Sequence, residues 1–137
     1  MPDLQRTTLN PPGAPKPLGA YSHAIKVSAG SLLYIAGQVG VDADGKLAGP
    51  DVGAQTQQVF QNIGRVLAGA GATFHNVVEF TTYLVGRSSI QSFIDARTEL
   101  FPGLYPEGDY PPNTLLVISG LVQEEFLVEI KTVAALP

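Results

Sequence analysis

The fold is decided by residues 51–85, which read DVGAQTQQVFQNIGRVLAGAGATFHNVVEFTTYLV. Between Val52 and Ala70, apolar residues recur at three- and four-residue steps, which is the spacing of one helix face. Asp51 can cap this helix because its carboxylate accepts free amide hydrogens of the first turn. Gly69 and Gly71 are the expected stop. The buried face is expected to consist of Val52, Thr56, Val59, Ile63, Val66, Leu67 and Ala70.

A strand and a second helix are expected next. Residues 76–85 read as a strand, with side chains directed alternately to its two faces. One face of it is expected to carry Val78, Phe80, Thr82 and Leu84. Ser88 or Ser89 can cap a second helix, and Pro102 with Gly103 is expected to end it. The apolar stripe of this helix consists of Ile90, Phe93, Ile94, Arg97 and Phe101.

The flanking segments predict further strands. Residues 20–27 and 31–39 read as strands joined by a turn at Ala29-Gly30, which predicts a hairpin. Near the C-terminus, two strands are expected around the connection 122–125. Their predicted ranges are 114–121 and 126–134, and residues 41–49 are expected to form a loop or a short strand.

These elements predict a single α+β domain at residues 17–137, after an extended proline-rich lead-in at residues 1–16. The order is β-β-(β)-α-β-α-β-β, with both helices on one face of a mixed sheet. The other face of the sheet must then be exposed to solvent or covered by a partner. Charged residues make up only 15% of the chain, and this low content favours a partner.

The composition argues against several classes of function. The net charge is −4 and the basic residues are scattered, so a nucleic-acid partner is not expected. There are no cysteines, and the two histidines, His23 and His75, lie without metal-ligand spacing. The apolar runs are strand-length, and the N-terminus has no signal-peptide core. We therefore expect a cytoplasmic protein without a metal site or a membrane span.

Three polar residues stand in apolar surroundings. Tyr21 and His23 share one face of the first strand, where Tyr21 can be a core aromatic and His23 a surface or interface residue. Glu129 lies inside the strand sequence FLVEI, where a carboxylate costs free energy unless it is paired or bound to water. It can pair with Lys131 on an open face, or it can hold a water molecule and act as a general base.

Six stretches, taken together, resemble one known family. They are LGAYSHAI at residues 18–25, LYIAGQ at 33–38, QTQQVFQNI at 55–63, NVVEFTTYL at 76–84, YPPNT at 110–114 and LVEI at 127–130. In this order they are similar to the Rid family, the reactive intermediate deaminases that are also called YjgF or RidA-like proteins. The resemblance covers nearly the whole chain from residue 15 onward.

The resemblance implies a chorismate-mutase-like fold and a barrel-like homotrimer with ligand clefts between subunits. It also implies a cofactor-free and metal-free hydrolase, a deaminase that converts small enamines or imines such as 2-aminoacrylate to a 2-oxo acid and ammonia. By motif position, Glu129 and Tyr21 correspond to the family's catalytic glutamate and site tyrosine. The substrate-binding residues are expected to be Asn113, Gly37, Thr114 and Leu115.

One position departs from the family pattern. The family's deaminases carry a carboxylate-binding arginine where this chain has Asn113. Arginine offers a carboxylate two charged parallel hydrogen bonds, so its loss is expected to cost ~2–4 kcal/mol. Position 113 alone therefore predicts poor turnover of 2-aminoacrylate, unless Arg87 or Arg97 reaches the cleft. The alternatives are a trimer that binds a small metabolite without turnover and, least favoured by the charge, a ribonuclease.

Overall fold

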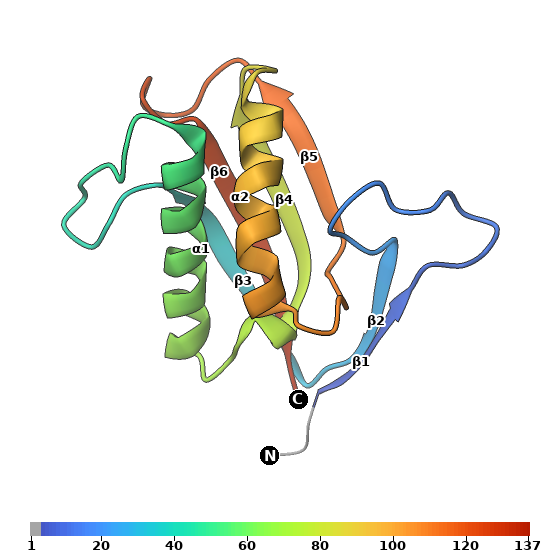
Figure 1. Cartoon of the computed structure of the whole chain (residues 1–137). Helices are drawn as coiled ribbons and strands as arrows, with labels where there is room; N and C mark the ends of the chain where they lie inside the picture. The colour runs from blue at the N-terminus through green and yellow to red at the C-terminus, as the bar shows by residue number, and fades with distance from the viewer. Residues whose placement is uncertain (1–3) are drawn as a thin grey trace.

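The computed structural model describes residues 4–137, and its main body is a mixed sheet covered by helices (Figure 1). The first three residues of the expected lead-in lie outside the described part. In order, the elements are β1 (Gln5–Leu9), β2 (Ala24–Ser28), β3 (Ser31–Val39), α1 (Val52–Gly69), the 3-10 helix η1 (Phe74–Asn76), β4 (Val77–Val85), α2 (Ser89–Leu104), β5 (Asn113–Ile118) and β6 (Val128–Leu136).

The main sheet has the strand order β3-β6-β4-β5, in which β4 and β5 are parallel and the other pairs are antiparallel. Both helices lie side by side over the same face of this sheet (Figure 1). The core fills the space between the helices and the sheet. The expected α+β architecture with two helices on one face is therefore confirmed.

Helix α1 follows the sequence pattern closely at its ends. The Asp51 side chain accepts a hydrogen bond from the Ala54 amide at 2.9 Å, and the helix ends at Gly69. Gly71 then adopts a positive φ of 71°. The buried face differs from the expected one: Val66 is 41% exposed and Ala70 is only half-buried, whereas Phe60 and the fully buried Gln55 belong to it. The hydrogen bonds of Gln55, described below, explain its place in the interior.

The expected hairpin between the first two strands is wrong. β2 instead pairs antiparallel with β1, a strand inside the lead-in, while β3 pairs with β6. Tight two-residue hairpin turns generally need positive φ, and Gly30 does not adopt it. The Gly30 amide donates to the Leu136 carbonyl at 2.9 Å, which continues the β3–β6 ladder instead.

The end of α2 and the register of β4 also differ from the sequence patterns. Helix α2 continues past Pro102 to Leu104, because a proline in the last turn removes a single helical hydrogen bond and the Tyr105 amide still bonds to the Phe101 carbonyl. In β4 the register shifts after Val77, so that Val77 is buried and Val78 is not. This bulge interrupts the period-two alternation on which the expected face depended.

The N-terminal arm, which we define as β1, β2 and the connection between them (residues 5–28), extends to the side of the main body (Figure 1). A partly buried ion pair connects it to the main body. Arg6 Nη1 lies 2.6 Å from Asp109 Oδ2, and Arg6 Nη2 donates to the Asp109 carbonyl at 2.8 Å. The arm is thereby fixed beside the loop that leads into β5.

Candidate functional site

Glu129 lies on β6, a central strand of the main sheet. Its neighbours in register are Val39 on β3 and Tyr83 on β4. Val128 and Ile130, on either side of it, are fully buried beneath the helices. The Glu129 side chain therefore projects from the opposite face, which the helices leave uncovered.

A bulge in β3 brings the backbone of Gly37 against this carboxylate. The β3–β6 register shifts between Ile35 and Gln38. As a result, two residues of β3, Ala36 and Gly37, lie opposite the single β6 residue Lys131. A Cβ at Gly37 would overlap the Glu129 carboxylate, with only 2.7 Å to its Cδ. Glycine at this position thus allows the carboxylate to lie against the strand. The bulge therefore makes room for the Glu129 carboxylate in the middle of the sheet.

The alternative in which Glu129 pairs with Lys131 is not what the structure contains. Among residues 4–137, neither side chain has an oppositely charged partner within 4.0 Å, and the acid–base contacts within that distance both involve Asp109. Glu129 is also only half-buried. The carboxylate is therefore open to a ligand or a water molecule from the uncovered face.

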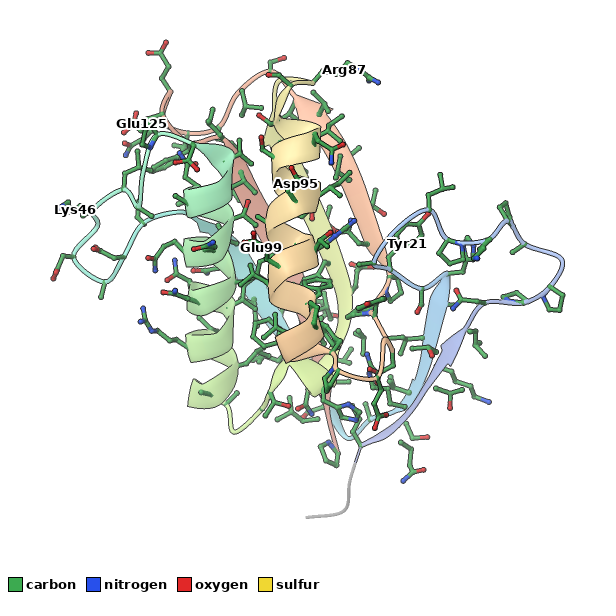
Figure 2. All side chains as sticks on the ribbon, in the orientation of Figure 1. Tyr21, Lys46, Arg87, Asp95, Glu99 and Glu125 are labelled. Atoms are coloured by element: carbon green, nitrogen blue, oxygen red, sulfur yellow. The ribbon has the colours of Figure 1, made fainter. Side chains whose placement is uncertain are left out.

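Tyr21 lies elsewhere, in the segment Leu18–Ser22 of the N-terminal arm. Figure 2 shows it beside the edge formed by β5. Its hydroxyl oxygen accepts a hydrogen bond from the Leu18 amide at 3.1 Å, so the hydroxyl proton remains available to a ligand. The Ser22 amide donates to the Pro111 carbonyl at 3.4 Å. His23 is exposed and packs edge-on against Tyr21, with 6.2 Å between ring centroids.

Asn113 occupies the start of β5 close to this segment, but it faces the helix side of the sheet. Its side-chain oxygen accepts a hydrogen bond from the hydroxyl of the buried Thr82 at 2.8 Å. Leu115 lies on the same side and packs against the core, whereas Thr114 pairs with Thr81 on the uncovered face. Asn113 in this chain thus has a structural hydrogen bond.

Arg97 reaches the Tyr21 segment from α2. Its side chain is buried, and a Cβ at Gly19 would lie 3.1 Å from its Nη2 atom. Burial lowers the pKa of the Arg97 guanidinium, and the nearby hydroxyl groups of Tyr21 and Tyr110 oppose that shift. Arg87, by contrast, is exposed in the turn before α2, far along the helix from Tyr21 (Figure 2). Of the two arginines, Arg97 is therefore the one beside Tyr21.

The expected site residues therefore form two groups within one chain. Glu129 and Gly37 lie on the uncovered face, whereas Tyr21 and Asn113 lie at the β5 edge. Strand β4 separates β6 from β5, which amounts to roughly 10 Å by strand spacing. A single copy of the chain does not bring the two groups together.

Comparison with known proteins identifies the family. A family model described as Endoribonuclease L-PSP matches residues 12–136. A RutC family protein of Pyrococcus horikoshii is 34% identical over 122 residues, covering 88% of this chain and 90% of the relative. The 2-iminobutanoate/2-iminopropanoate deaminase of Bos taurus is 34% identical over 107 residues, covering 77% of each. The chain belongs to the Rid (YjgF/RidA) family.

The fold agrees with this assignment. The crystal structure of YyfB of Yersinia pestis, described as a Rid family protein of unknown function, superimposes with a TM-score of 0.85 at 35% identity. The match covers 96% of this chain and 98% of the YyfB chain. The expected Rid fold, chorismate-mutase-like with two helices on a mixed sheet, is thus confirmed.

Two residues of this Rid chain gained importance only from the structure, which also decides between the two candidate arginines. Tyr83 faces Glu129 across the β4–β6 ladder, which the alternation of β4 alone did not single out. Gln55 donates to the carbonyls of Gly49 and Glu125 at 3.0 Å and accepts from the Leu127 amide at 2.9 Å, two residues before Glu129. Arg97 had a visible signal, since it is the one charged residue in its apolar stripe.

The described part of the chain contains neither a metal-holding cluster nor a membrane-spanning helix. Within residues 4–137, no group of three or more His, Cys, Asp or Glu side chains is arranged to hold a metal ion. No helix in that part is both long and apolar enough to cross a membrane.

Proposed function

We propose that this chain hydrolyses small reactive enamines or imines to a carbonyl compound and ammonia, with Glu129 positioning the attacking water. The observation that carries the proposal is the Glu129 carboxylate, which lies against Gly37 on an uncovered face without an ion pair. The similarity to the 2-iminobutanoate/2-iminopropanoate deaminase of Bos taurus supports the same chemistry.

The reaction needs one general base and one water molecule. An enamine first takes a proton at carbon and becomes an imine. Glu129 then accepts a proton from the water as the water oxygen bonds to the carbon of the protonated imine, which gives a neutral carbinolamine and a protonated Glu129. Proton transfer to nitrogen releases ammonia and leaves the carbonyl compound. Every atom comes from the substrate and water, so this chemistry requires no metal or cofactor.

The second element of the proposal is a homotrimer with clefts between subunits. The uncovered sheet face carries large exposed apolar side chains, including Tyr34 at 70% and Leu116 at 42% exposure. Exposed apolar area of this kind favours contact with another protein surface. A second copy would also bring its Tyr21 group to Glu129, which a single chain does not do. The trimer therefore completes the proposed site.

The test is a turnover assay on imines generated in solution by an amino-acid dehydratase, with the released 2-oxo acid reduced by a coupled dehydrogenase. The wild-type chain should accelerate hydrolysis over the uncatalysed rate. Glu129→Gln keeps the shape but removes the base, so turnover should fall ~10²–10⁴-fold. Glu99→Gln, which changes an exposed glutamate on α2, away from the uncovered sheet face, is the matched control and should leave turnover unchanged.

A binding protein without activity is the alternative, and the loss of the arginine at position 113 favours it. In that case the wild-type chain would bind 2-oxo acids or imines but leave the hydrolysis rate at its uncatalysed value across the whole panel. That result would contradict the hydrolase. Full turnover by Glu129→Gln would equally remove Glu129 from the reaction.

A further inference from the structure

Arg97 is a buried cation without a carboxylate partner. Its side chain is only 6% exposed, and its Nε atom has no hydrogen-bond partner among residues 4–137. None of the ion pairs in that part of the chain involves it. The two acidic residues of the same helix, Asp95 and Glu99, are exposed and lie on the outer surface of α2 (Figure 2). A buried charge that lacks a counter-ion is costly, so this arrangement needs a reason.

The surroundings hold the guanidinium but do not neutralise it. Its Cζ atom lies 5.3 Å from the ring centroid of Phe93 and 5.9 Å from that of Phe101. Such cation–π contacts offset part of the burial cost and fix the orientation of the side chain. They use the aromatic faces and consume none of the N–H donors. The planar fork of donors that matches a carboxylate is therefore still available.

The segment Leu18–Ser22 covers this guanidinium. Gly19 is exposed, and a Cβ atom added to it would lie 3.1 Å from Arg97 Nη2, which is closer than an ordinary van der Waals contact. The backbone link from this segment to the β5 side is the 3.4 Å bond from Ser22 to Pro111, which is long for a hydrogen bond. An anion that binds Arg97 would therefore displace this segment, and it would lie next to Tyr21.

We propose that Arg97 is the carboxylate-binding residue of this chain, and that it binds the carboxylate of a small 2-imino or 2-oxo acid beneath segment 18–22. It supplies from α2 the positive charge that Asn113 lacks. The choice of imino and oxo acids rests on the proposed function, whereas the need for an anion rests on the buried, unpaired guanidinium. Poor turnover of 2-aminoacrylate, expected from position 113 alone, is then no longer expected.

The first test compares a charged and a neutral ligand on the wild-type chain. Calorimetric titration with 2-oxobutanoate should give at least about tenfold tighter binding than titration with 2-oxobutanamide, since only the acid can use the charged fork. Equal affinities, or no binding of the acid, would overturn the proposal. This comparison needs no variant, so it decides the matter even if a substitution at position 97 prevents folding.

The second test uses variants. Arg97→Met keeps length and apolar packing but removes the charge, so the acid should lose at least about tenfold in affinity while the amide changes little. Its melting temperature should stay unchanged or rise, because an unpaired buried charge has been removed. Arg97→Lys should bind the acid with intermediate affinity, and Arg87→Gln, the exposed control, should match wild type. Undiminished acid binding by Arg97→Met would refute the assignment.

The binding readout separates this inference from the proposed function. Glu129→Gln should bind 2-oxobutanoate as wild type does and fail only in turnover. Binding through Arg97 without any turnover would leave the inference standing and contradict the hydrolase. Turnover of charged imines with an unchanged KM in Arg97→Met would leave the hydrolase standing and contradict the inference.

Discussion

The substitution Gly37→Ala should displace the proposed base, Glu129, without changing that residue itself. A Cβ at this position would lie 2.7 Å from Glu129 Cδ, whereas ordinary contact begins at 3.4 Å. The carboxyl group must therefore move by at least about 0.7 Å, and the uncovered face gives it room to do so. Since misplacement of a catalytic group by about 1 Å can cost ~10² in rate, we expect a loss of that order.

Stability should hardly change, because the displaced side chain moves toward solvent and alanine is acceptable in a strand. The assay is imine turnover alongside thermal unfolding. Gly69→Ala is the matched control, since its Cβ meets nothing within 4 Å and it should leave turnover unchanged. In a Glu129→Gln background, Gly37→Ala should cause no further loss. Full turnover by Gly37→Ala, or an equal loss in both backgrounds, would refute the positioning argument.

Two further predictions concern stability. Gln55→Leu leaves the Leu127 amide and two backbone carbonyls without their partner, so chemical denaturation should show a loss of about 3 kcal/mol, and Gln57→Leu, an exposed neighbour, should show almost none. Asn113→Ala leaves the buried Thr82 hydroxyl without its partner and should lower the free energy of unfolding by about 1 kcal/mol. This loss should vanish in a Thr82→Val background. A loss that persists there would disprove the role of the hydrogen bond.

The sequence predicted correctly those features that depend on residues close together in the chain. The cap at Asp51, the stop at Gly69 and the period of α1 depend on residues within a few positions of each other. The same holds for Glu129, whose exposed place on the sheet follows from alternation along β6.

The misses involve partners that are distant in the chain. Nothing near Ala24–Ser28 indicates that this strand pairs with Gln5–Leu9 rather than with the strand that follows it. The isolation of Arg97 was also invisible, because it depends on where Gly19 and the acidic residues of α2 lie in space. Only the fold shows that Asn113 turns toward Thr82 while Glu129 projects from the other face.

The central claim is that Glu129 and the Tyr21 group act together only across a subunit boundary. Its most direct test is a mixture of two impaired variants, Glu129→Gln and Tyr21→Phe, unfolded and refolded together in equal amounts. If each site takes one group from each of two neighbouring subunits, about one quarter of the sites regain both wild-type residues. The mixture should then recover about one quarter of wild-type turnover. Turnover no higher than the average of the two variants alone would contradict the account.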